Sequence, residues 1–181
     1  MEKKMKRKDK MAVHHSSVNH SFETDPSFFK AIQQKFGKFT LDAAATKKNA
    51  LCKEFFTEET DALGMAWRPR KGGLWFCNPP YGRGLINWVS KASDEGSMYE
   101  GIMLIPARTD TQWFEMAANY GEVILLKGRQ QFYFKGKPAK HWSKKFECYK
   151  VAKAPFPSAL IHFGPDVDKG LITLGLGVGG W

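Results

Sequence analysis

The pattern of apolar and polar positions predicts strands and helices that alternate along the chain. Four apolar runs have the length of buried strands, at residues 38–45, 73–77, 101–106 and 122–126. Apolar residues recur at helical spacing in three other segments, at residues 26–36, 85–93 and 112–118. This alternation predicts βαβ units, and therefore an α/β fold with a mostly parallel sheet and helices on both faces.

Capping and breaking residues define several of these boundaries. Thr24-Asp25-Pro26 offers a helix N-cap followed by proline in the first turn, and Gly37 ends that helix. Thr109-Asp110-Thr111 caps the helix that begins at Gln112. The apolar run 73–77 must stop at Pro79-Pro80, because two successive prolines cannot continue a strand ladder.

Two shorter segments complete the predicted sheet. Residues 55–57 form a very short strand, and residues 157–163 form one last buried strand. We expect the last strand to pair antiparallel with residues 122–126 at an edge of the sheet.

The length of 181 residues corresponds to one ordinary domain with a tail. Residues 1–20 are polar and basic without periodicity, which predicts a flexible lead-in before a domain at 21–174. Residues 175–181 are glycine-rich, so we expect them to fray. No apolar run reaches the roughly 18 residues that span a bilayer, and no apolar signal core follows the basic start. We expect a soluble, unexported protein of the cytoplasm with no membrane partner.

Composition narrows the class of partner. The formal net charge of +10 and a pI near 9.5 raise encounter rates with polyanions, so nucleic acid is the expected partner. Part of this charge lies in a basic run at residues 1–10 that can also be a plain solvated tail. Cys52, Cys77 and Cys148 are scattered and odd in number, which argues against disulfides. No C-x-x-C or H-x-x-x-H spacing supports zinc, and we expect no metal.

The tetrapeptide Asn78-Pro79-Pro80-Tyr81 carries the most specific chemistry. An exocyclic amino group on adenine or cytosine is a poor nucleophile, because its lone pair is delocalised into the ring. Two acceptors that hold its two N–H bonds, the Asn78 side-chain oxygen and the Pro79 carbonyl, stabilise the transition state by localising that lone pair. The prolines restrict the backbone and aim the carbonyl, and Tyr81 can stack on a base swung out of the duplex. The alternative is a simple proline-rich turn after a strand.

The chain resembles the amino-methyltransferases of DNA, whose signature is (Asp/Asn/Ser)-Pro-Pro-(Tyr/Phe/Trp). It is more closely similar to the phage-type, Dam-like DNA N6-adenine methyltransferase family. Five blocks in order carry this resemblance: FTLDAAATKKNALCKEFFTEETDAL (39–63), GLWFCNPPYGR (73–83), MLIPARTDTQWFE (103–115), KGRQQF (127–132) and APFPSAL (154–160). The resemblance implies a Rossmann-like S-adenosylmethionine-dependent methyltransferase fold, with S-adenosylmethionine over the carboxyl ends of the strands. For a phage-encoded member it implies the host cytoplasm.

The same resemblance implies residues for the cofactor site. Asp42 matches the acid at the end of the first strand that organises this site, with Ala43 after it; a helix-capping aspartate is the alternative. Asn49 and Asp61 match positions able to contact the adenosine or methionine part. Thr24 resembles the Thr-Pro element that touches the amino-acid end of the cofactor, although another residue intervenes here before the proline.

Two departures from the family pattern affect this assignment. No Gly-x-Gly loop follows Asp42, and residues 43–45, all alanine, take its place. Asp42 and Asn78 are 36 positions apart, too few for three full crossovers, so we expect an abbreviated sheet.

Base flipping costs unstacking energy that contacts to the DNA backbone must offset. Basic residues mixed with aromatics at 127–153 suit phosphate contacts and stacking, and predict a DNA-recognition insert. The candidate DNA-binding residues are Arg108, Arg129, Lys140, Lys144 and Lys145. The alternatives are a surface ion pair for Arg108 and an ordinary hairpin with inward-packed aromatics for the insert.

These features predict an enzyme that transfers methyl groups from S-adenosylmethionine to adenine N6 in double-stranded DNA. Cytosine N4 methylation is the alternative within the same chemistry. A non-catalytic nucleic-acid-binding relative of the fold is the alternative of another class, and a methyltransferase of RNA or of a protein side-chain amide is the third. The recognition sequence, the oligomeric state and the role in protecting host or viral DNA do not follow from the sequence.

Overall fold

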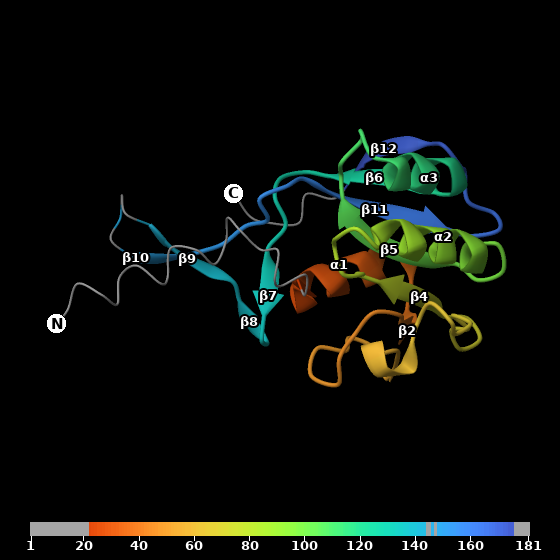
Figure 1. Ribbon diagram of the computed structural model, residues 1–181, viewed down its shortest axis with the longest axis horizontal. Coiled ribbons are helices and arrows are strands. Elements are labelled where there is room, and N and C mark those ends of the chain that lie inside the picture. The colour runs from red at the N-terminus through yellow and green to blue at the C-terminus, as the bar shows by residue number, and fades with distance from the viewer. Residues whose placement is uncertain (1–21, 144–145, 147, 176–181) are drawn as a thin grey trace.

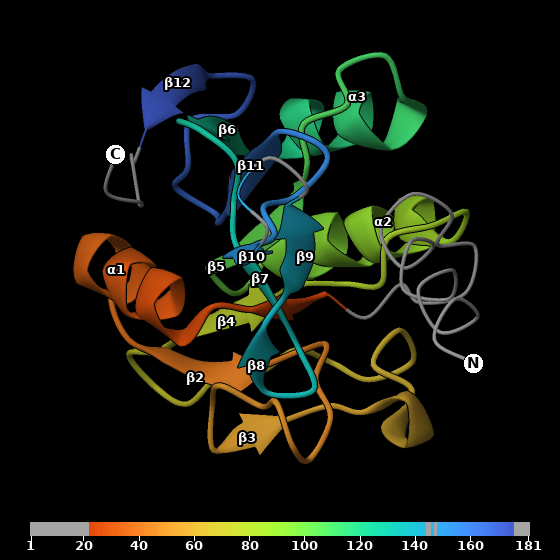
Figure 2. The ribbon, with the colours of Figure 1, turned by 90° about the vertical axis from the view of Figure 1, so that its left-hand side faces the viewer.

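The computed structural model describes residues 22–143, 146 and 148–175. Within them one sheet of seven strands lies between helices on its two faces (Figures 1 and 2). The predicted lead-in at 1–20 and residues 176–181 of the predicted tail lie outside the described residues. No helix in the described part of the chain is long and apolar enough to cross a membrane.

The order of the strands in this sheet differs from their order in the sequence. From one edge to the other they are β12 (Ile172–Gly175), β6 (Glu122–Leu126), β11 (Ser158–Phe163), β5 (Gly101–Pro106), β4 (Leu74–Cys77), β2 (Phe39–Asp42) and β3 (Glu54–Phe55). All strands run in one direction except β11, which is antiparallel to both β5 and β6. The predicted mostly parallel α/β sheet is confirmed.

The helices divide between the two faces of the sheet (Figure 2). Helix α1 (Pro26–Phe36) covers one face, and helices α2 (Leu85–Gly96) and α3 (Gln112–Tyr120) cover the other. Successive side chains of a strand point to opposite faces, and β5 supplies both layers. Its Ile102 and Leu104 join the core on the α1 side, whereas Met103 and Ile105 join the core under α2 and α3. Burial on both faces explains why β5 reads as an unbroken apolar run.

The predicted helix boundaries hold closely. Asp25 caps α1 by accepting a 2.8 Å hydrogen bond from the Ser27 backbone N–H, and Gly37 ends the helix with φ of 114°. Helix α2 runs to Gly96 and α3 to Tyr120, each slightly further than predicted.

One expectation about the sheet is wrong. β11 does pair antiparallel with β6, but it lies inside the sheet, between β6 and β5. The chain turns back after β11 through a loop with Gly170 at φ of 77°, and β12 then adds to β6 as the edge strand. Residue 175 therefore belongs to a strand, not to a frayed tail. The interior position agrees with the almost complete burial of β11.

The segment 127–153 forms a hairpin region of its own. β7 (Phe132–Phe134) pairs with β8 (Lys137–Pro138) and with β1 (Glu23–Thr24), so the start of the described chain is tied to this segment. β9 (Lys140–Ser143) and β10 (Cys148–Val151) form a separate two-stranded antiparallel hairpin. Figure 1 shows this β9–β10 hairpin extending away from the main sheet.

Candidate active site

The candidate site lies at the carboxyl ends of β2 and β4, which are parallel neighbours. Asp42 ends β2, and Asn78 follows the last residue of β4. The Ala43 N–H donates a 2.7 Å hydrogen bond to the Phe76 carbonyl, which holds the two strand ends together. Ligands of open α/β sheets bind in the crevice outside these ends, so Asp42 and the tetrapeptide occupy the expected edge.

The orientation of the Asn78 amide is determined by its hydrogen bonds. Its Nδ2 donates to the Phe22 carbonyl at 2.8 Å and to Thr24 Oγ1 at 2.9 Å, so both N–H bonds are used. Asn78 Oδ1 is consequently the end that faces the loop, and it accepts a 2.8 Å hydrogen bond from the Tyr81 hydroxyl. An amide oxygen has two lone pairs, so Asn78 can accept one further hydrogen bond from a ligand.

The loop that carries the two prolines is held against the sheet at both of its ends. Pro79 is buried and Pro80 is exposed, and neither has an N–H to donate. The Tyr81 hydroxyl also contacts the Leu104 carbonyl of β5 at 3.3 Å. The loop is therefore tied to β5 at its far end as well as to β4.

The Tyr81 ring lies in an aromatic cluster. Its partners are Phe22, Phe132 and Phe156, with ring centroids 5.9, 6.1 and 5.6 Å from that of Tyr81. The residue is 8% exposed, and burial raises the pKa of its phenol well above the ordinary value. A base can reach the face of Tyr81 only after rings of this aromatic cluster move.

Asp42 is buried, with 3% of its surface exposed. Its carboxylate oxygens accept hydrogen bonds from the backbone N–H groups of Ala44 at 3.3 Å and Leu51 at 3.1 Å. Burial raises the pKa of this carboxyl from 3.8 to about 6, and the two hydrogen bonds partly oppose the rise. Burial and the neighbouring Asp42 charge raise the pKa of the Cys52 thiol to about 12. Asp42 thus anchors the loop 43–51 at the carboxyl edge of the sheet.

The other two residues matched to the cofactor site lie further along the chain. Asn49 Oδ1 accepts hydrogen bonds from the Thr46 N–H at 2.6 Å and the Thr46 hydroxyl at 3.0 Å, which closes a turn within the loop 43–51. Asp61 is exposed and has φ of 47° at the end of the short 3-10 helix η3 (Glu58–Thr60). The structure therefore joins Thr24, Asn78 and Tyr81 directly and links Asn49 to Asp42 only through their shared loop.

The candidate DNA-binding residues are dispersed over the surface. Arg108 is exposed just after β5, at the same edge of the sheet as Asn78, because β4 and β5 are parallel. Arg129 is exposed between β6 and β7, and Lys140 is exposed on β9. Lys144 and Lys145 lie outside the described residues.

The partners that orient this site could not be identified from the sequence. The carbonyl of Phe22 and the rings of Phe132 and Phe156 contact the tetrapeptide from segments far away in the chain. Every residue has a backbone carbonyl, so the sequence does not indicate which one will accept a hydrogen bond from Asn78. The only available signal for the rings was their place in or beside the blocks that carry the family resemblance.

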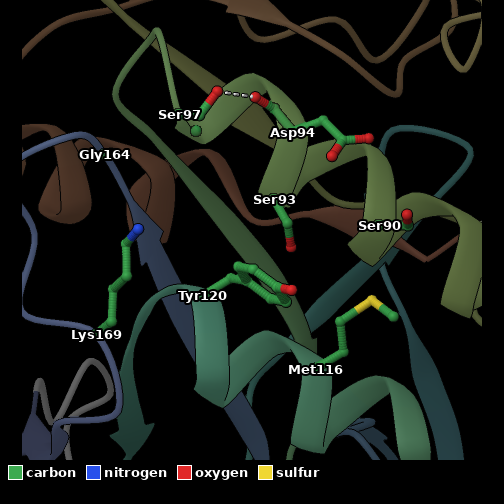
Figure 3. Close-up of a pocket in the computed structure, with 9 residues that line it drawn as sticks. Ser90, Ser93, Asp94, Ser97, Met116, Tyr120, Gly164 and Lys169 are labelled. Atoms are coloured by element: carbon green, nitrogen blue, oxygen red, sulfur yellow. Dashed lines mark hydrogen bonds between the residues drawn. The ribbon is translucent and has the colours of Figure 1, made fainter.

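A pocket of about 290 Å³ lies elsewhere, between α2, α3 and the loop after β11 (Figure 3). Its lining includes Ser93, Asp94, Tyr120 and Lys169 and none of the candidate site residues. β11 is antiparallel to its neighbours, so the loop after it lies at the amino edge of the sheet, opposite to Asn78. In the described part of the chain, no group of three His, Cys, Asp or Glu residues is placed to hold a metal ion.

Comparisons with known proteins find the same class of protein as the signature of the tetrapeptide, the amino-methyltransferases of DNA. Residues 12–152 match the family described as DNA N-6-adenine-methyltransferase (Dam). The chain is 35% identical over 112 residues to the DNA N-6-adenine-methyltransferase of Escherichia phage T1. The aligned residues make up 61% of this chain and 46% of the phage protein. It is 34% identical over 77 residues to the "Putative methyltransferase YfdM" of Escherichia coli (strain K12), covering 41% of this chain and 85% of that protein. The chain thus spans less than half the length of the phage T1 relative. The family match covers most of the sequence, and the chain belongs to the DNA N-6-adenine-methyltransferase (Dam) family.

Proposed function

We propose that the protein transfers the methyl group of S-adenosylmethionine to N6 of adenine in double-stranded DNA. We assign the sheet and its helices to the Rossmann-like fold of S-adenosylmethionine-dependent methyltransferases. The observation that carries the proposal is the orientation of the Asn78 amide, whose two N–H bonds are held by Phe22 and Thr24. Membership of the Dam family supports adenine as the base.

The chemistry requires two acceptors at the amino nitrogen. Asn78 Oδ1 has a free lone pair, and the second acceptor is the carbonyl of the next residue, Pro79, whose ring restricts the backbone. Together they hold the two N–H bonds and localise the nitrogen lone pair. In the methyl transfer that S-adenosylmethionine would supply, the amino nitrogen would gain the methyl group, the sulfur would leave as a neutral thioether, and the displaced proton would pass to solvent. Preorganised acceptors need no rearrangement at that moment, which is the main source of such stabilisation.

The bound cofactor supplies a methyl group attached to a cationic sulfonium. A buried acid at the carboxyl edge suits a cationic ligand, and Asp42 provides it next to the tetrapeptide strand. Because both Asp42 oxygens already accept backbone N–H bonds, its direct task is to shape the loop 43–51 around the ligand. We assign Ala43, Asn49 and Asp61 to the same site on the family resemblance.

The segment 127–153 is proposed to hold the DNA. The β9–β10 hairpin extends from the sheet (Figure 1), and two basic residues on it, Lys140 and Lys150, are exposed. Tyr149 is 63% exposed on the same hairpin, so this aromatic residue does not pack into the core. Exposed basic and aromatic side chains suit phosphate contacts and stacking against bases. Arg108 and Arg129 would contact the DNA backbone nearer to the flipped base.

The test compares Asn78→Ala with Asn87→Ala, a matched change at an exposed position of α2. Methyl transfer from labelled S-adenosylmethionine to unmethylated DNA is expected to fall by about 10²–10³ in kcat for Asn78→Ala, since one positioned acceptor is removed. Asn87→Ala should transfer at the wild-type rate. Cofactor affinity, measured by calorimetry, should stay within a few-fold for both variants. Transfer by Asn78→Ala at full speed would refute the proposal.

The same assay separates the two alternatives. Digestion of the product DNA into nucleosides should give N6-methyladenine, whereas N4-methylcytosine would assign the protein to the other amino-methyltransferase reaction. A protein that binds DNA but gives no heat with S-adenosylmethionine would be a non-catalytic relative of the fold.

A further inference from the structure

Two buried polar side chains have no hydrogen-bond partner among the described residues. They are Gln130, through Nε2, and Ser158, through Oγ, with 3% and 1% of their surfaces exposed. A third such atom, Glu95 Oε2, belongs to a carboxylate that pairs with Lys91 through its other oxygen, so it has a structural explanation. Buried polar groups are normally satisfied, and unpartnered ones often mark a functional position.

Both side chains face the layer that contains Tyr81. Ser158 opens β11 opposite Pro106, and Leu160 two residues later packs into the core on the α1 side. Residues two apart in a strand share a face, so Ser158 points into the same layer at the carboxyl edge.

The backbone around Gln130 places its side chain in the same direction. Gln131 forms a β-bridge with Lys153, so the chain is extended there, and Gln130 and Phe132 point to one side. Phe132 packs against Tyr81 in the aromatic cluster. The Gln130 carbonyl also accepts a 2.7 Å hydrogen bond from Ala154, which anchors its backbone. An unpartnered amide donor therefore faces the rings that must move to admit a base.

We propose that Gln130 donates a hydrogen bond from Nε2 to a ring nitrogen of the extruded adenine. This inference rests on the proposed function and deepens it. Once Asn78 and Pro79 hold both hydrogens of N6, the in-plane edges of adenine next to N6 offer only acceptors, N1 and N7. The complementary protein group must be a donor, and Gln130 Nε2 is a donor without a partner among the described residues.

The test uses DNA in which adenine is replaced throughout by 1-deazaadenine or by 7-deazaadenine, each lacking one of these acceptors. Wild-type protein should lose about ten- to a hundredfold in kcat/KM on one analogue, the scale of one buried hydrogen bond. Gln130→Leu should show a similar loss on ordinary DNA and no further loss on that analogue. Both proteins meet the same altered flanking bases, so the difference between them reports on Gln130.

Two controls keep the result interpretable. Gln130→Leu should unfold at the wild-type temperature or above it, because an apolar side chain of similar size replaces an unpartnered amide. Gln34→Leu, the same change at an exposed position of α1, should respond to both analogues as the wild type does. The inference is overturned if Gln130→Leu responds to both analogues as strongly as the wild type, or if the wild type is insensitive to both. Asn78→Ala tests the proposed function separately, so the two failures are distinguishable.

Discussion

Replacement of Thr24 by valine removes one of the two acceptors that orient the Asn78 amide and keeps the shape of the side chain. Thr24 Oγ1 accepts from Asn78 Nδ2 at 2.9 Å, and the residue is buried, so water cannot replace the missing oxygen. The backbone of Thr24 pairs with Phe132 of β7, and this pairing does not depend on the side chain. The substitution therefore acts on the Asn78 amide with little change elsewhere.

The size of the effect follows from these hydrogen bonds. One N–H bond of the partly buried Asn78 amide becomes unpartnered, while the other stays on the Phe22 carbonyl. Leaving one buried donor unpaired costs about 1–2 kcal/mol when the group keeps its second hydrogen bond. If the cost falls on the aligned state of Asn78 Oδ1, kcat should drop by about 5- to 30-fold.

Steady-state kinetics distinguish this role of Thr24 from direct contact with the cofactor. Positioning of Asn78 predicts a lower kcat with an unchanged dissociation constant for S-adenosylmethionine, measured by calorimetry. Thr40→Val on β2 is the matched control, because it also removes one accepted hydrogen bond, from the Arg70 N–H. A weaker affinity for the cofactor at unchanged kcat would show that Thr24 acts on the cofactor and would refute our reasoning.

Two further predictions concern the acid and the hairpin. The raised pKa of Asp42 means that its carboxyl is protonated, and therefore uncharged, below about pH 6. Affinity for the cationic cofactor should therefore fall as the pH drops below that value, by up to about tenfold for each pH unit. Calorimetry between pH 5 and 7.5 should show this dependence in wild type and not in Asp42→Asn; an equal slope in both proteins would contradict it. Combined charge reversal of Lys140 and Lys150 should weaken DNA binding and reduce the salt slope of log K by about one for each phosphate that the hairpin no longer neutralises. Lys71→Glu, exposed before β4, should have little effect, and unchanged binding by the hairpin variant would exclude this hairpin from the DNA interface.

Much of the fold could be predicted from local pattern alone. The β5 segment is apolar at every position because it is buried on both faces, and this run of apolar residues is visible in the sequence. Asp25 and Gly37 bound α1 through local capping, which also depends only on neighbouring residues. The tetrapeptide was placed after a buried strand because prolines cannot continue a ladder.

The edge of the sheet was not predictable in this way. β12 has only four residues and is followed by glycine-rich sequence, so the short apolar stretch at 171–174 does not by itself predict a strand, and Ile172 stays 57% exposed. Its existence depends on pairing with β6, about fifty residues earlier in the chain. β11 lies inside the sheet for a separate reason, because it pairs with β5 as well as with β6.

The sequence by itself determined which residues form the buried strands of the sheet and that the tetrapeptide follows β4, because burial and proline geometry act within a few positions. Only the tertiary structure decided how the Asn78 amide is turned, since its two acceptors belong to residues 56 and 54 positions away. The same holds for the burial of Tyr81 and for the unpartnered amide of Gln130. Hydrogen bonds and ring packing depend on distances of a few ångströms between segments that only folding brings together.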